Sequence, residues 1–405
     1  MTPAPDNGKC KALRIAICGA GVGGLVLAAR LARMGFAPMV FEARSEAAAA
    51  REGVFLTLAP NGMNGLRAID AFEAVRSEGV ETTGIEIRNG GGRRLALVNQ
   101  SDHEGRFGAP SVTIGRGRLA ALLAAAARNA GAELRFGAEV VDIACTGDQV
   151  RLRTSEGGVF EADLLVGADG LGSRVRDIVF PDYPKPRYTG QIGTGGVVDA
   201  PVADTGGVMR MTFGDQAFFG YLKAAGGPVY WFDSYAAPEQ AIGRICDPER
   251  YARHIRALHA DDPEPNRAIL ERVSGLDRNY PIRDMPQLPS WRRGPVVLIG
   301  DAAHAVGPHA GQGASMAVED ALVLAACLGE DPRPAKAFPR YERLRRGRVQ
   351  AVVKLTARNG SQKAASGPVG LFLRDLLLRV FIPLGTRAAH RHFRYRADRT
   401  PLAKS

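Results

Sequence analysis

Short apolar runs alternate with longer amphipathic segments along the first part of the chain and again near its end. Leu13–Ile17 and Pro38–Phe41 predict strands, and the apolar spacing of Leu25–Met34 between them predicts a helix that ends at Gly35. Further strands are predicted at Glu133–Phe136, Glu139–Cys145, Gln149–Thr154, Leu164–Val166 and Val296–Ile299, and helices near Gly62–Val75 and at Arg118–Asn129 and Ala314–Leu328. Strands that alternate with helices indicate an α/β fold.

The pattern changes between about residues 181 and 289, where glycine, proline and aromatic residues become more frequent. Short strands are predicted at Met209–Phe213, Phe218–Leu222 and Val229–Tyr235, and also earlier, at Gly84–Arg88 and Arg94–Val98. Since the first pattern returns at Pro295, we expect one domain assembled from residues 1–80, 111–180 and 291–350. A second, β-sheet domain is expected from residues 81–110 and 181–290, followed by a C-terminal helical segment over 351–405.

The composition indicates a folded chain with more than one domain. A chain of 405 residues exceeds the size at which a single core usually stops growing, and 45% hydrophobic with 23% charged residues is ordinary for a globular protein. The net charge is +11, and the basic residues are mostly arginines that lie scattered along the whole chain. Their densest group, at residues 340–348, contains Tyr341 as its only aromatic, so we interpret it as a solvated helix face and expect no nucleic-acid partner.

The cysteines and the apolar segments favour a cytoplasmic protein. The five cysteines show no paired spacing, and the first apolar run leads into glycines instead of a signal cleavage site. Leu371–Leu384 is apolar but is interrupted by Arg374, Asp375 and Arg379, which share one side of a helical projection. It is too short and too charged to span a bilayer, so no stable membrane insertion is expected. Packing on the domain is favoured over contact with a membrane surface.

A glycine-rich turn follows the first strand. Gly19, Gly21 and Gly24, with Gly23 between the last two, satisfy the G-x-G-x-x-G pattern, and Glu42 ends the next strand. The first glycine permits the tight turn, the second lets the backbone approach a pyrophosphate, and the third lets helix and strand pack closely. Glu42 would accept hydrogen bonds from a ribose. This context predicts a dinucleotide site, the alternative being a tight turn without a ligand.

Two further segments indicate which dinucleotide the chain is expected to bind. One runs from Asp163 through Asp169-Gly170 to Arg176, and the other from Gly300-Asp301 to Gly311-Gln312-Gly313. Together with the glycine pattern, and in this order, they resemble the para-hydroxybenzoate hydroxylase-like, class A flavoprotein monooxygenases over roughly residues 13–350. The resemblance implies a Rossmann-like FAD-binding domain of the glutathione-reductase type, an inserted β-rich substrate domain and C-terminal helices.

The roles that the resemblance implies agree with the chemistry of the residues. Asp301 would accept hydrogen bonds from the ribityl hydroxyls, although an aspartate there can also cap a helix. Gly311 and Gly313 would let the backbone approach the flavin ring, and the helix from Ala314 would direct its positive end at the ring edge that becomes anionic on reduction. The predicted cofactor contacts are Gly19, Gly21, Gly23, Gly24, Glu42, Arg44, Gly53, Val54, Arg116, Asp169, Gly300, Asp301, Pro308, Gly311, Gln312, Gly313 and Ala314.

Some of these positions have a second interpretation. Asp169 and Arg176 could instead form an internal pair that fixes a turn, and Arg44 could simply be exposed to solvent. His304 is interpreted as a structural, hydrogen-bonded histidine in preference to a proton shuttle. Pro308, beside the ring, and His309, which could touch substrate, are the predicted catalytic positions.

The resemblance implies a monooxygenase that uses NADH or NADPH and O₂. Reduced FAD would form a C4a-hydroperoxide and pass one oxygen atom to an aromatic or polycyclic small molecule, by hydroxylation or epoxidation. Arg210, Phe219, Tyr221 and Trp231 are the predicted substrate contacts, although core packing explains these aromatic residues equally well. A same-fold reductase or dehydrogenase that does not use O₂ and a non-enzymatic FAD-binding protein are the alternatives. No metal site and a monomer or homodimer are expected.

Overall fold

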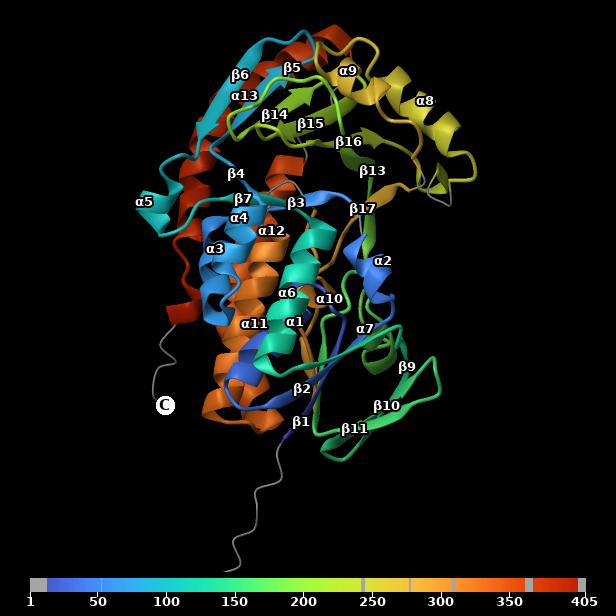
Figure 1. Ribbon diagram of the computed structural model, residues 1–405, viewed down its shortest axis with the longest axis vertical. Helices are drawn as coiled ribbons and strands as arrows, with labels where there is room; N and C mark the ends of the chain where they lie inside the picture. Colours follow the sequence, from blue (N-terminus) through green and yellow to red (C-terminus); the bar gives the residue numbers. More distant parts are fainter. Residues whose placement is uncertain are drawn as a thin grey trace, which may run out of the picture.

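Two large sheets organise the chain, one within a helical α/β body and the other beside it (Figure 1). The computed structural model describes residues 13–51, 53–241, 245–276, 278–307, 311–360 and 367–399. The predicted α/β fold class is confirmed. The predicted strands and helices are present with ends that differ by at most three residues, with one exception. The single helix predicted near Gly62–Val75 is divided into two α-helices and a short 3-10 helix, Arg67–Ile69, because Asp70 adopts a left-handed conformation with φ 56°.

The six-stranded sheet is parallel except at one edge, where the outermost strand, β18 (Arg292–Arg293), runs antiparallel to its neighbour, β19 (Val296–Leu298). In spatial order its strands are β18, β19, β12 (Leu164–Gly167), β1 (Arg14–Cys18), β2 (Ala37–Glu42) and β8 (Glu133–Phe136). Since parallel strands end at the same edge, the segments that follow β1, β2, β12 and β19 meet there. These segments carry the glycine turn, Asp169 and Asp301, and Glu42 is the last residue of β2.

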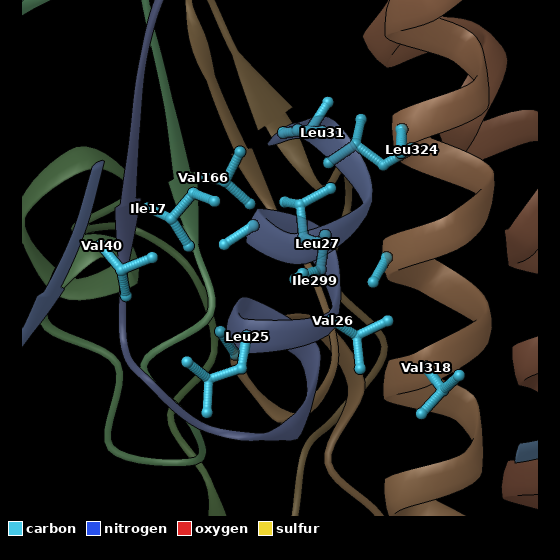
Figure 2. Close-up of a cluster of buried hydrophobic side chains, with 14 of the residues drawn as sticks. Ile17, Leu25, Val26, Leu27, Leu31, Val40, Val166, Ile299, Val318 and Leu324 are labelled. Atoms are coloured by element: carbon cyan, nitrogen blue, oxygen red, sulfur yellow. The ribbon is translucent and has the colours of Figure 1, made fainter. Parts of the chain in front are cut away.

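Five helices build the body around this sheet. They are α1 (Val22–Arg33), α6 (Arg116–Ala130), α10 (Asp301–His304), α11 (Gly313–Glu330) and α12 (Pro334–Gly360). Figure 2 shows that α1 lies between the sheet and α11: its side chains Leu25, Val26, Leu27 and Leu31 pack among Ile17, Val40, Val166, Ile299, Val318 and Leu324. The helix that begins at the glycine turn is therefore fixed on both sides by the main core.

The seven-stranded sheet combines two distant parts of the sequence, residues 84–99 and 187–284. In spatial order its strands are β17 (Tyr280–Asp284), β13 (Arg187–Val198), β16 (Val229–Ala236), β15 (Ala217–Lys223), β14 (Val208–Phe213), β5 (Gly84–Asn89) and β6 (Arg94–Asn99). Helices α8 (Pro248–Leu258) and α9 (Asn266–Glu271) cover one face, which we call the outer face. The opposite, inner face meets α13 (Gly367–Phe393) and the α/β body.

Smaller elements complete the fold. They are the sheet of β3 (Phe55–Leu58), β7 (Val112–Gly115) and β4 (Val80–Glu81), the sheet of β9 (Val140–Thr146), β10 (Gln149–Thr154) and β11 (Val159–Ala162), and the helices α2 (Glu46–Ala50), α3 (Pro60–Leu66), α4 (Phe72–Glu78), α5 (His103–Phe107) and α7 (Arg174–Val179). Strand β3 joins the two parts of the molecule, because the Phe55 ring packs edge-on against Tyr230 and Phe232 of β16.

Helix α13 packs on the seven-stranded sheet, where Leu378 enters a core cluster with Phe213 and Phe218. The charged residues Arg374 and Asp375 face the protein and are buried. In the part of the chain that the structure describes, no helix is long and apolar enough to cross a membrane.

The arginine-rich segment of α12 corrects one interpretation from the sequence. We expected a solvated helix face, but Arg345 is completely buried, and it pairs with Glu319 and Asp320 of α11. Arg348 also pairs with Glu319. Arg345 can be buried because two acidic residues of the neighbouring helix balance its charge.

A second buried charged cluster lies between the outer face and α8. His259 is completely buried; its Nδ1 lies 2.9 Å from Asp262 Oδ2 and its Nε2 lies 3.6 Å from Asp233 Oδ2 on β16. Burial by itself lowers the pKa of His259, but the two carboxylates outweigh it and raise the pKa to about 9. Asp262 is the closer partner, and burial raises the pKa of Asp233. His259 is therefore protonated at neutral pH.

We expect stability to depend on pH through this histidine. Because the pKa of folded His259 lies above the 6.5 of an unperturbed histidine, its contribution is fully present below pH 6.5 and is lost as the pH rises through about 9. The free energy of unfolding should fall by about 3 kcal/mol over this interval. Urea unfolding between these pH values measures the loss, which should be absent in His259→Asn. An equal fall in that variant would assign the loss to another group.

Candidate active site

The glycines of the first turn serve two different purposes. Gly19 has φ +102°, and a side chain there would begin 2.5 Å from the carbonyl oxygen of Ala168. A Cβ atom at Gly24 would lie 2.0 Å from the carbonyl oxygen of Gly19, so both Gly19 and Gly24 require glycine for internal packing. At Gly21, by contrast, the nearest protein atom would be 3.9 Å away. The surface at Gly21 is therefore open to a ligand, as the position of the second glycine predicts.

Two helices begin at this edge without a side-chain cap. Helix α1 starts after Gly21 and helix α11 after Gln312, and neither has an acidic residue in its first turn. The first N–H groups of a helix have no partner within it and lie at the positive end of its dipole. Both helix ends thus provide donors for anionic or carbonyl groups of a ligand.

Glu42 lies beside the glycine turn. Its side chain is buried and accepts hydrogen bonds from the backbone N–H of Ala20 at 2.8 Å and from Nε of Arg44 at 2.8 Å. Burial by itself raises the pKa of Glu42, but these hydrogen bonds outweigh it and the pKa is lowered. Glu42 is consequently ionised and held in place by Arg44, which is ion-paired rather than merely exposed to solvent.

Asp301 opens helix α10 and is in an unusual electrostatic position. Its carboxylate is accessible to solvent and makes no hydrogen bond to the described residues, so it does not cap α10, whose N-cap is Gly300. Surrounding protein nevertheless raises the pKa of Asp301 by burial, and interaction with His304 and Arg116 partly offsets that increase. The Asp301 carboxylate is therefore available to hydrogen-bond donors of a ligand.

The turn before α11 approaches Asp301. A side chain at Gly313 would meet its nearest protein atom, Oδ1 of Asp301, at 4.0 Å, and one at Gly311, where φ is +57°, would meet none within 4 Å. The backbone is thus bare on the side of Asp301. The predicted catalytic residues Pro308 and His309 lie outside the described residues.

The segment with Asp169 is internally bonded. Asp169 accepts hydrogen bonds from Ser173 Oγ at 2.5 Å and from the backbone N–H of Val175 at 3.0 Å. Arg176 is buried and donates to the carbonyl oxygens of Leu171 and Ala302 at 2.7 and 3.0 Å. The two residues therefore fix the turn through separate partners, and Arg176 supports α10 from behind.

Gly53 and Val54 connect this edge with the seven-stranded sheet. The carbonyl oxygen of Val54 accepts a hydrogen bond from the backbone N–H of Arg116 at 2.9 Å. A side chain at Gly53 would begin 2.8 Å from the hydroxyl of Tyr280, and one at Gly195 would begin 2.9 Å from the Val54 side chain. The segment therefore passes between Arg116 and the strands β13 and β17.

The four predicted substrate contacts lie together on the seven-stranded sheet. Phe219, Tyr221 and Trp231 are buried in the core beneath α8 and α9, where the Phe219 and Trp231 rings stack at 5.9 Å. Arg210 pairs with Tyr221 across β14 and β15 and lowers its pKa slightly against the increase from burial. These residues belong to the outer face, and their contact with substrate stays a prediction.

The inner face carries a different aromatic set, which the predicted substrate contacts did not include. Phe232 and Tyr230 alternate with Trp231 along β16, are only half-buried, and contact Phe55. A side chain at Gly220 would begin 2.4 Å from the Phe232 ring, so this ring lies flat over the neighbouring strand. The alternation along β16 separates these residues from Trp231, but it does not tell which face meets the α/β body.

A buried polar network supports α10 and α11 and was also missed. Asp320 is completely buried and accepts hydrogen bonds from His304 Nε2 at 2.5 Å, from Arg345 Nε at 2.7 Å and from the backbone N–H of Gly300 at 2.9 Å. This geometry supports the structural interpretation of His304. The network holds Gly300, and hence Asp301, in position.

The arrangement fits a flavin dinucleotide. The open position at Gly21 and the uncapped α1 suit a diphosphate, ionised Glu42 suits a ribose diol, and the unpaired carboxylate of Asp301 suits a polyhydroxyl chain. Bare backbone at Gly311 and Gly313 suits a flat ring. Among the described residues, no group of three or more His, Cys, Asp or Glu could hold a metal ion.

Comparison with known proteins agrees with this fit. A family model described as an FAD binding domain matches residues 12–356. The chain belongs to the para-hydroxybenzoate hydroxylase-like, class A flavoprotein monooxygenases. Members of this family use FAD, with NADH or NADPH as the reductant, so the predicted cofactor and enzyme class are confirmed.

Individual relatives extend over nearly the whole chain. The aurachin C monooxygenase/isomerase of Stigmatella aurantiaca is 32% identical, over 91% of this chain and 94% of that protein. The 6-hydroxynicotinate 3-monooxygenase of Bordetella bronchiseptica is 30% identical, over 93% and 98%. The structure of Klebsiella pneumoniae HpxO with FAD and uric acid is similar in fold, with a TM-score of 0.76, 22% identity and coverage of 96% and 94%.

Proposed function

We propose that this monooxygenase hydroxylates a flat, electron-rich aromatic or heteroaromatic molecule held between FAD and the inner face of the seven-stranded sheet. The observation that carries this proposal is the position of Phe55. It follows the Gly53–Val54 segment bonded to Arg116, and it contacts Tyr230 and Phe232. The predicted cofactor contacts Gly53, Val54 and Arg116 and an aromatic surface are thereby adjacent.

The named activities of relatives support this substrate class. The two proteins quoted above are called an aurachin C monooxygenase/isomerase and a 6-hydroxynicotinate 3-monooxygenase, and a third, from Klebsiella oxytoca, is a 3-hydroxybenzoate 6-hydroxylase. We infer that this chain likewise acts on a ring compound. Half-buried aromatic side chains such as Tyr230 and Phe232 suit such a ring, because aromatic pairs gain from stacked and edge-on contacts beyond area burial.

We propose roles for the residues along the bound cofactor. Gly21 and the start of α1 would bind the diphosphate, Glu42 the adenosine ribose, and Asp301 the ribityl chain. The turn at 311–313 would pass beneath the ring, with the positive end of α11 near its pyrimidine edge. Bound FAD would supply the redox chemistry, accepting hydride from NAD(P)H and activating O₂.

The chain itself would position the substrate and exclude water. Residues 1–80, 111–180 and 291–350 are proposed as the FAD-binding domain, and residues 81–110 and 181–290 as the substrate domain. Phe55, Tyr230 and Phe232 would keep water from the reacting atoms, which prevents the loss of activated oxygen as H₂O₂. The cysteines Cys18, Cys145 and Cys327 are free thiols, which supports a cytoplasmic location.

The test is a substrate screen with the purified holoenzyme. Candidate aromatic and heteroaromatic compounds are compared for faster NAD(P)H oxidation, oxygen consumption and a product one oxygen atom heavier. A substrate that stimulates all three supports the proposal. A substrate that is reduced or dehydrogenated without oxygen consumption would establish the alternative, a reductase or dehydrogenase of the same fold.

We expect substitutions on the inner face to change substrate binding and coupling, and substitutions on the outer face to change stability. Phe232→Ala should raise the KM for the substrate about tenfold and increase the share of NAD(P)H oxidation that ends as H₂O₂, because the aromatic wall is lost. Trp231→Phe, on the other face of the same strand, should lower thermal stability and leave the coupling unchanged. Peroxide and product are measured against NAD(P)H consumed. Unchanged coupling in Phe232→Ala would remove the inner face from the substrate site.

A further inference from the structure

Helix α13 exposes a continuous apolar face. Phe372, Leu373, Leu376 and Leu377 are 64, 50, 49 and 48% exposed. Their spacing places them on one side of a helix, over two successive turns. Among the described residues, the other exposed large hydrophobic side chains lie singly on separate elements: Leu97, Val159, Val197 and Leu344. We call the four residues of α13 the apolar face.

The orientation of α13 is fixed by its polar residues, which point inward. Arg374 donates to the carbonyl oxygens of Phe213 and Gly214, both at 2.9 Å. Asp375 accepts a hydrogen bond from Asn89 Nδ2 at 2.8 Å. Rotation of α13 to bury the apolar face would expose Leu378 to water and break these bonds. The apolar face is therefore presented outward by specific contacts.

Positive charge is concentrated in the same part of the chain. Residues 349–397 contain nine Lys or Arg and a single acid, Asp375, so they account for eight of the eleven excess positive charges. Asp375 is buried, whereas Arg379, near the apolar face, and Arg93, whose guanidinium lies 3.8 Å from Asp375, are exposed. Two exposed arginines, Arg379 and Arg93, consequently provide positive charge beside the apolar face.

We propose that the apolar face of α13 binds the surface of an anionic lipid bilayer. Exposed Phe and Leu side chains flanked by Arg are the combination by which a helix settles at the boundary between headgroups and acyl chains. A second copy of this chain is a poorer partner, because its apolar face is flanked by the same two arginines and the two copies would repel. The contact is peripheral, since no described helix can cross a membrane.

The experiment is co-sedimentation of the FAD-loaded protein with two kinds of vesicle, phosphatidylcholine alone and phosphatidylcholine mixed with phosphatidylglycerol. The wild type should sediment with the mixed vesicles and remain in solution with the neutral ones. The double variant Phe372→Ser/Leu376→Ser should partition onto mixed vesicles about tenfold or more weakly. Added salt should weaken the binding of the wild type without abolishing it.

Val159→Ser is the matched control, because Val159 is equally exposed on β11 and outside the apolar face. It should bind vesicles like the wild type, and all variants should retain bound FAD and the same thermal unfolding. Absence of binding to mixed vesicles, or equal binding by the double variant, overturns the proposal. So does a concentration-dependent dimer that the double variant converts to monomer without any vesicle binding, because the partner is then a second copy.

Discussion

Gly21→Val should yield a folded protein that binds FAD at least about 100-fold more weakly, a loss of roughly 2.7 kcal/mol. The backbone at Gly21 has φ −77° and ψ −177°, an extended conformation that valine adopts readily. A Cβ there would meet no protein atom closer than 3.9 Å, so the apoprotein has room for it. The diphosphate of FAD does not, because its place is against this backbone and the first N–H groups of α1.

The measurement is a titration of apoprotein with FAD, followed by flavin fluorescence, beside urea unfolding of the same apoprotein. Gly24→Ala is the informative control, because its Cβ would begin 2.0 Å from the carbonyl oxygen of Gly19. That variant should lose roughly 3 kcal/mol of stability even without FAD. If Gly21→Val bound FAD as tightly as the wild type, the diphosphate would have to lie elsewhere.

The contrast between these two glycines also shows what sequence could predict. Gly19, Gly21 and Gly24, Glu42 and Asp301 belong to short continuous segments at the ends of predicted strands. In a parallel sheet such ends converge, so local patterns were sufficient to bring these residues to one edge. The position of Asp301 at this edge could be predicted without knowledge of distant contacts.

The substrate side could not be predicted in the same way. Strand alternation along β16 separates Tyr230 and Phe232 from Trp231, but both sets are aromatic and either could pack in a core. The decision depends on α8 and α9 covering one face and on Phe55, about 175 residues earlier in the chain, contacting the other. The sequence interpretation therefore chose residues that lie on the outer face.

The network around Asp320 was missed for a related reason. Glu319 and Asp320 interrupt an otherwise apolar helix, and Arg345 lies 25 residues after Asp320 in a segment interpreted as solvated. Two adjacent acids inside a buried helix are a signal in themselves, since buried charges occur only with partners. Combined with the following arginine cluster, that signal could have predicted the pairing of α11 with α12.

Asp320→Ala should be the most destabilising single substitution in this network, at about 3–5 kcal/mol. It would leave the completely buried Arg345 with Glu319 as its remaining ion-pair partner and would remove the acceptor for His304 and for the backbone N–H of Gly300. Because Gly300 precedes Asp301, the affinity for FAD should fall as well. Urea unfolding of the apoprotein and FAD titration measure the two effects separately.

The loss of unfolding free energy in Asp320→Ala should be constant from about pH 5 to 8. Burial by itself raises the pKa of Asp320, but the charges of His304 and Arg345 outweigh burial and hold its pKa well below the usual range. A carboxyl with a lowered pKa contributes stability above its unfolded pKa of about 3.9 and loses it only in stronger acid.

Asp142→Ala is the control for Asp320→Ala, because Asp142 pairs with Arg153 on the exposed surface of β9 and β10. It should change the free energy of unfolding by less than about 0.5 kcal/mol. If Asp320→Ala changed the free energy of unfolding as little as Asp142→Ala, the buried charges of α11 and α12 would not hold the loop at Gly300. The position of Asp301 would then depend on the main apolar core alone, and Asp320→Ala would bind FAD like the wild type.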